Sequence, residues 1–139
     1  MNIIEITRRT RTTAETALEN RSVAVTQDGL SVPRFQNNNE RSIVTIGIDK
    51  FTDLVSTYDR KTTARATIVA RIYEVVDQKT NRAKAEENLL TISTKLIKAF
   101  GDDRNLDTSD SATWQRKPRL DKANFIVGDV AFEREIEID

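Results

Sequence analysis

The sequence predicts an α+β fold, in which a mainly antiparallel sheet has one long amphipathic helix, and an N-terminal helix, packed on one face. Residues 64–76 and 126–138 alternate apolar and polar side chains with the period of a strand. Between them, residues 82–100 repeat apolar side chains with the period of a helix. Helices on one face of such a sheet form an α+β layer. The 139 residues suffice for one core, so residues 1–139 are expected to form a single domain.

Residues 2–18 begin the chain with a helical pattern of apolar and small side chains. The pattern recurs at three- and four-residue spacing in Ile3, Ile6, Thr10, Ala14, Ala17 and Leu18. Five threonines in the same stretch lower its helix propensity, because branched side chains lose rotamer freedom in a helix. A helix and an extended N-terminal segment therefore remain alternatives.

A long loop is expected around residues 26–41. Val23 and Val25 form a short alternating stretch before it, and Asp28-Gly29 is a turn signal. Polar residues follow as far as the asparagine run 37–39. This loop leads into the next strand and does not divide two domains.

Two strands are predicted next, at residues 42–49 and 64–76. In the first, Gly47 indicates a bulge or a close backbone approach. In the second, small side chains on one face would let a helix lie close to the sheet. That face comprises Ala64, Ala66, Ile68, Ala70 and Ile72.

The helix predicted at residues 82–100 is the clearest element of the chain. Leu89, Ile92, Leu96 and Phe100 form its apolar stripe. Glutamates lie early and lysines late, which suits the helix dipole. Gly101 is expected just beyond the last helical residue.

A polar loop is expected around residues 101–124, before the closing strand. Residues 60–84 hold seven basic and two acidic side chains, whereas residues 125–139 hold one basic and five acidic. If the two long strands are antiparallel neighbours, Arg65 and Arg71 face the terminal glutamates, and opposite charges across the pair favour that register.

Composition excludes several classes of catalytic site. The chain has no histidine and no cysteine, so it has no Ser-His-Asp or Cys-His arrangement, no thiolate site and no histidine-ligated metal. Its four glycines are too scattered for a phosphate-binding loop. Residues 103–107 match the start of a calcium-binding loop, but Thr108 and Trp114 stand where such a loop needs glycine and glutamate. We expect no enzyme activity and no catalytic, cofactor-binding or metal-binding residues.

Charge balance and hydropathy limit the partners of the chain. Its 22 basic and 22 acidic residues give no net field toward nucleic acid or acidic membranes. No apolar run reaches the length of a signal-peptide core or the ~18 residues of a membrane span. We therefore expect neither secretion nor membrane contact.

Two sets of residues are candidate contact sites. Basic clusters suit phosphate or a protein partner, with ordinary surface or subunit salt bridges as the favoured explanation; they are Arg8, Arg9, Arg11, Arg116, Lys117 and Arg119. The sheet face opposite the long helix carries apolar side chains among its charges, which suits a subunit interface; these are Val69, Tyr73, Val75, Phe125 and Val127. Cover of that face by the N-terminal segment is the alternative.

The order of these elements resembles that of the tail terminator proteins, also called tail completion or head–tail joining proteins, of tailed bacteriophages. The resemblance rests on the N-terminal helix, the loop near Val32-Pro33, strands 42–49 and 64–76, helix 82–100 and strand 125–138. It implies a structural virion protein without catalytic residues. Such a protein forms a homohexameric ring that caps the tail tube, stops its polymerisation and joins it to the head.

The resemblance also implies partners and a location. The partners would be further copies of the chain, the tail tube protein, neck or connector proteins and a sheath, with DNA only in transit through the lumen. The location would be the tail or neck of a virion assembled in the cytoplasm of a bacterial host. Two alternatives remain: another neck, connector or baseplate subunit, and a small nucleic-acid-binding or regulatory module that uses the arginine clusters.

Overall fold

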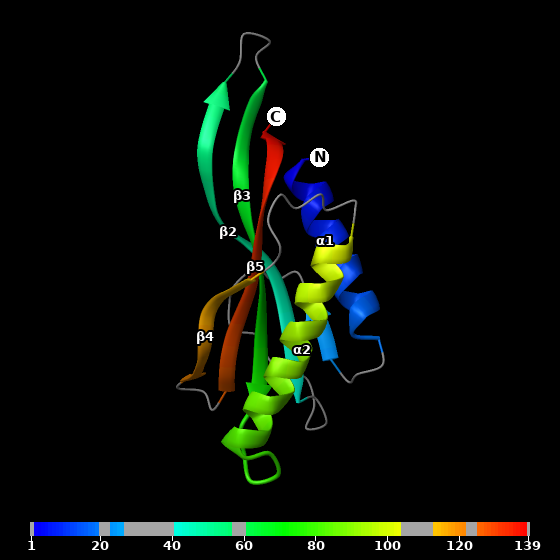
Figure 1. Ribbon diagram of the computed structural model, residues 1–139, viewed down its shortest axis with the longest axis vertical. Coiled ribbons are helices and arrows are strands. Elements are labelled where there is room, and N and C mark those ends of the chain that lie inside the picture. Colours follow the sequence, from blue (N-terminus) through cyan, green and yellow to red (C-terminus); the bar gives the residue numbers. More distant parts are fainter. Residues whose placement is uncertain are drawn as a thin grey trace.

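In the residues that a computed structural model of the chain describes, there are two helices and five strands (Figure 1). It describes residues 2–19, 23–26, 41–56, 61–103, 113–121 and 125–138, and for residues 23–26 and 113–121 it describes the backbone alone. The elements are α1 (Ile3–Ala17), β1 (Val23–Thr26), β2 (Ser42–Ser56), β3 (Thr62–Val75), α2 (Arg82–Asp102), β4 (Thr113–Asp121) and β5 (Phe125–Ile138).

The five strands form one sheet in the order β1-β2-β3-β5-β4. β1 runs parallel to β2, whereas every other neighbouring pair is antiparallel. β3 is central, pairing with β2 on one side and with β5 along its whole length on the other. The predicted α+β class and the mainly antiparallel sheet are confirmed.

The first segment is a helix, so the extended alternative was wrong. Asn2 caps α1 by accepting a hydrogen bond from the Glu5 backbone N–H at 2.9 Å, and Glu5 returns the contact in a capping box. The threonines are accommodated because hydroxyls donate to the carbonyl four residues earlier, as Thr10 does to Ile6 at 2.7 Å. Ile6, Thr10 and Ala14 form the buried stripe.

The long helix α2 follows its predicted pattern on the buried side. Asn81 caps it by accepting a hydrogen bond from the Lys84 backbone N–H at 2.9 Å. The predicted stripe is buried, from Leu89 to Phe100. The end was placed wrongly, because α2 continues to Asp102 and Gly101 lies inside the helix.

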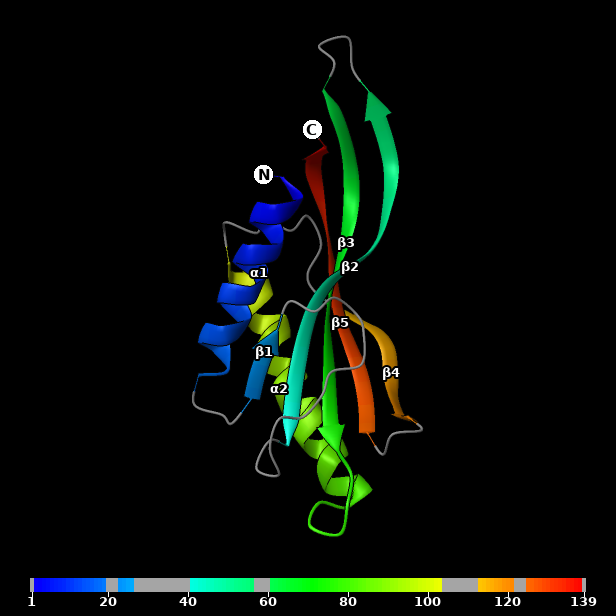
Figure 2. The ribbon, with the colours of Figure 1, turned by 180° about the vertical axis from the view of Figure 1, so that it is seen from behind.

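One hydrophobic core joins both helices to one face of the sheet. Its β3 members Ala66, Ile68, Ala70 and Ile72 alternate along the strand, with buried residues of α1 and α2 in the same cluster. Figures 1 and 2 show the two helices side by side against the sheet, with the strands in front when seen from behind. This side of the sheet is called the helix face below.

Two strands differ from the prediction. β2 continues to Ser56, whereas the prediction ended it at Asp49. The second half of the strand is exposed and two register shifts break its alternation, so it lacks the pattern from which a strand is predicted. β4 occupies residues 113–121, inside the loop expected at 101–124. Its pairing with β5 is shifted between Arg116 and Arg119, on either side of Pro118, which has no backbone N–H to donate. In the loop expected at 26–41, residues 27–40 lie outside the described part of the chain.

A hairpin projects from this body. Here the hairpin arm means residues 49–56 of β2 and 62–67 of β3. In the described sheet, β1 pairs only with residues 42–45 of β2, and β4 pairs only with residues 125–131 of β5. Figures 1 and 2 show the hairpin extending beyond both helices.

Candidate functional site

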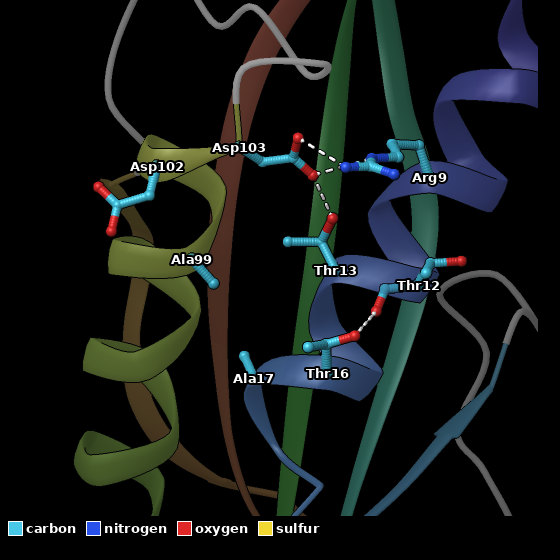
Figure 3. Close-up of a pocket in the computed structure, with 8 residues that line it drawn as sticks. All are labelled: Arg9, Thr12, Thr13, Thr16, Ala17, Ala99, Asp102 and Asp103. Carbon is cyan, nitrogen blue, oxygen red and sulfur yellow. Dashed lines mark hydrogen bonds and ion pairs between the residues drawn. The ribbon is translucent and has the colours of Figure 1, made fainter.

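An open pocket lies between α1 and the end of α2, and the Asp103 carboxylate is part of its lining (Figure 3). Arg9 donates to both oxygens of Asp103, at 3.0 and 3.1 Å, and the Thr13 hydroxyl donates to the same carboxylate. Hydrogen bonding to Asp103 raises the pKa of Arg9. The Asp103 side chain is 7% exposed, so the carboxylate is already held by the protein. This arrangement clamps the two helices together.

Only the first position of the calcium-like loop lies in the described part of the chain. Asp103, its first ligand position, binds Arg9 and Thr13, and residues 104–107 lie outside the described part. Within the described ranges, no group of three acidic, histidine or cysteine residues is placed to hold a metal ion. Among those same residues, no helix combines the length and the apolar character needed to cross a membrane.

A second hollow lies where α1 begins and the hairpin arm leaves the body. It is an apolar groove of about 310 Å³ lined by Asn2, Ile3, Ile4, Phe51, Ile136, Glu137 and Ile138. The register places Phe51 opposite Ala66 and Ile136 opposite Ala64, so these two larger side chains flank β3 from β2 and from β5.

Large apolar side chains are exposed around this groove and along the hairpin arm. Ile4 is 65% exposed, Phe51 51%, Leu54 66%, Val55 52% and Ile138 36%. A monomeric protein ordinarily scatters such residues singly, and a group of them on a projecting element is typical of a contact surface. The hairpin arm and its groove are therefore the candidate functional site.

The predicted interface residues lie together but on a different part of the sheet. Register pairs Tyr73 with Val127 and Val75 with Phe125, and the Tyr73 and Phe125 rings meet edge to face at 6.1 Å. Val69, Tyr73 and Val127 are 3%, 1% and 1% exposed, so the open face expected there is not found at these positions. The N-terminal helix does not supply the cover, because Ile6 and Ala14 pack with the helix face.

Ion pairs lie on the same side of the sheet as Tyr73. Arg71 donates to both oxygens of Asp129, at 2.7 and 3.0 Å, and this contact raises the pKa of Arg71. Arg65 reaches Glu133 at 3.3 Å. The predicted antiparallel register is confirmed, with one difference: Arg71 faces Asp129 instead of a terminal glutamate.

The two basic clusters are not brought together. Arg9 is held by Asp103, and Arg11 bonds Glu15 at 2.8 Å on the same helix. Arg8 lies beside Ile4 at the start of α1. The other cluster, residues 116–119, belongs to β4 at the opposite edge of the sheet from β1 and β2. A single basic surface for nucleic acid is therefore not formed by the two.

Sequence reasoning missed the hairpin arm. The signal was present in Phe51, Leu54 and Val55, three large apolar residues directly after the predicted end of a strand. Interruption by Asp49, Lys50 and Asp53 concealed it, because those charges remove the strict alternation by which strands are recognised.

Known proteins give little guidance to function. No protein-family model matches the chain, and no curated protein matches it. Among solved structures, it is similar to a chain of the "virion of native gene transfer agent (GTA) particle", with 16% identity and a TM-score of 0.44, over 94% of this chain and 88% of that one. A similarity of that size assigns neither a family nor a function.

Proposed function

We propose that this chain is a structural, non-enzymatic subunit of a phage-like virion. Specifically, we propose a tail terminator that forms a ring, which we take to be a hexamer, at the end of the tail tube. The ring stops polymerisation of the tube and joins it to the head or neck.

One observation carries the proposal. The helix–sheet core already buries the apolar stripes of both helices, yet the hairpin arm exposes Phe51, Leu54 and Val55 beyond it. A side chain of this kind contributes about 1.5–3 kcal/mol when it is fully buried. Self-association would bury this surface, as expected of a subunit in a ring.

The arrangement of elements supports the same proposal. The N-terminal helix, the strands β2 and β3, the long helix and the closing strand β5 follow the order on which the resemblance to tail terminators rests, and β4 is an additional strand between α2 and β5. A charge-neutral chain without histidine or cysteine suits a structural role, with tail tube, neck and sheath proteins as partners and DNA only in transit through the lumen.

The decisive experiment examines particles assembled without this chain. Negative-stain electron microscopy of a deletion strain should show tubes longer than normal and not joined to heads. Restoring the gene should restore the normal length. Tails of normal length that fail to join heads would replace the terminator with a neck or connector subunit, and unaltered particles would exclude a virion role.

A binding test separates this proposal from a nucleic-acid-binding module. The purified chain is mixed with duplex DNA at low salt and run on a native gel. A monomeric chain that shifts DNA, and loses the shift when Arg8 and Arg11 are changed to alanine, would contradict the structural proposal. A self-associating chain that leaves DNA free agrees with it.

A further inference from the structure

β2 consists of two halves that differ in burial. Residues 42–47 are buried, whereas every residue from 49 to 56 is exposed except Thr52, which is half-buried. The change falls at Asp49, which the pairing of β2 with β3 skips between Ile48 and Lys50. Below, the inner half of β2 means residues 42–48 and the outer half means residues 50–56.

Buried apolar pairs attach the inner half to β3. The pairs are Ile43 with Tyr73, Val44 with Ile72, and Ile46 with Ala70. The last two pairs belong to the hydrophobic core that also contains the buried residues of both helices. Detaching the inner half would therefore open the core itself, so it requires unfolding of the whole domain.

The outer half is attached mainly by pairs that include a polar side chain. These pairs are Lys50 with Thr67, Thr52 with Arg65, Val55 with Thr63, and Ser56 with Thr62. Phe51 lies opposite Ala66, but Phe51 is 51% exposed. Because stabilisation grows with the apolar area removed from water, the outer half is held much less firmly than the inner half.

β3 has a second neighbour that keeps it in the sheet. β5 pairs with β3 along its whole length, from Thr62 to Val75. Ile136 of β5 lies opposite Ala64 and belongs to the hydrophobic core. Residues 62–67 of β3 can therefore stay in place when the outer half of β2 leaves.

We infer that the outer half of β2 detaches from β3 as a unit while the inner half stays in the sheet, with Asp49 as the hinge. In the closed state the outer half is one strand of the projecting hairpin (Figures 1 and 2). In the open state β2 no longer covers the edge of β3 over residues 62–67, so backbone N–H and C=O groups are released there. The outer half is thus a removable cover for that edge. The opening is a property of the isolated chain and does not depend on the proposed ring.

Native-state hydrogen exchange of the full chain, measured for single amides by NMR, tests this opening. The comparison uses β2 amides that donate to β3, because the other amides of the strand point to its opposite edge. We expect those of the outer half to exchange at least about 100-fold faster than those of the inner half. The halves differ by more than one buried apolar side chain, and each such side chain changes an equilibrium constant by roughly 10- to 100-fold.

Urea distinguishes local opening from global unfolding. A local opening exposes little surface, so exchange of the outer half should be insensitive to low urea concentrations. Exchange of the inner half should accelerate with urea, because it requires the whole domain to unfold.

Ile46→Val provides a matched variant. Ile46 is 1% exposed, and its contacts persist when only the outer half detaches. The substitution should speed exchange of the inner half by roughly 2- to 12-fold, as expected from the loss of one buried methyl group. Exchange of the outer half should be the same as in the parent chain.

Three results would overturn the inference. Equal rates and equal urea dependence in the two halves would show that β2 opens only as a whole. Acceleration of both halves by Ile46→Val would show that the outer half exchanges through global unfolding. Exchange of the β3 amides that donate to β5, at the rate of the outer half, would show that both strands of the hairpin arm detach together.

Discussion

Asp103, the residue directly after α2, is bound through both carboxylate oxygens by Arg9 of α1. The two residues are 94 positions apart in sequence, and Thr13 of α1 bonds the same carboxylate. This contact joins the N-terminal helix to the end of the long helix, just after the buried core residue Phe100.

Asp103→Ala should lower the thermal and urea stability of the chain, because it leaves Arg9 and Thr13 without their shared acceptor. Asp102→Ala is the matched control, since Asp102 lines the same pocket but points away from α1 in Figure 3. Thermal unfolding of the two variants measures the difference. Equal midpoints would show that the clamp contributes nothing.

The ion pair between Arg71 and Asp129 should contribute more to the free energy of unfolding than the more exposed pair between Arg65 and Glu133. Its side chains are 15% and 5% exposed, whereas those of Arg65 and Glu133 are 32% and 41% exposed. Removing one member of a buried pair leaves the other charge buried without its partner. Asp129→Ala should therefore lower the free energy of unfolding by about 3 kcal/mol.

The control for this pair is Glu133→Ala, which should cost less than about 1 kcal/mol because its partner stays hydrated. Urea denaturation of both variants at neutral pH provides the comparison. Similar losses in the two would mean that burial does not govern these ion pairs.

The turn between β3 and α2 should make stability depend on pH. Arg41 donates to both oxygens of Asp77, at 2.6 and 2.8 Å, and the backbone N–H groups of Lys79 and Thr80 donate to the same carboxylate. These contacts hold the pKa of Asp77 well below its ordinary value of 3.8.

A lowered pKa in the folded state means that the unfolded chain binds the proton more readily. The stabilisation from Asp77 is therefore fully present above its ordinary pKa of 3.8 and is lost as the pH falls through the lower folded value. Asp77→Asn should unfold at a lower urea concentration than the parent at pH 7, and the gap should narrow below pH 3.8. A gap independent of pH would contradict this assignment.

Sequence periodicity predicted the parts of the fold that bury one face. β3 and β5 alternate, and α2 carries a stripe from Leu89 to Phe100, because each element has one buried face and one more exposed face. Such patterns can be recognised from the sequence. β4 could not, because its basic residues and Pro118 give no alternation, and its place depends on pairing with β5. The parallel pairing of β1 with β2 likewise depends on the path of the chain in space.

The candidate site was hidden from the sequence for a related reason. Its groove is lined by Ile4, Phe51 and Ile136, which come from three separate elements of the chain. The predicted interface around Tyr73 was sought on the correct strands, but whether a face is open depends on burial, which periodicity does not specify. The exposure of these side chains is known only from the structure.

The last prediction concerns Asp53, which shapes the hairpin arm. Its φ of 53° lies in the left-handed region, inside the register shift between Thr52 and Val55. Aspartate tolerates this region better than most residues, glycine occupies it without steric cost, and a β-branched residue is strained there. Asp53→Gly should therefore be nearly neutral, whereas Asp53→Val should cost about 1–2 kcal/mol of free energy of unfolding. Urea denaturation measures both, and an equal cost for the two substitutions would show that the backbone can relax around position 53.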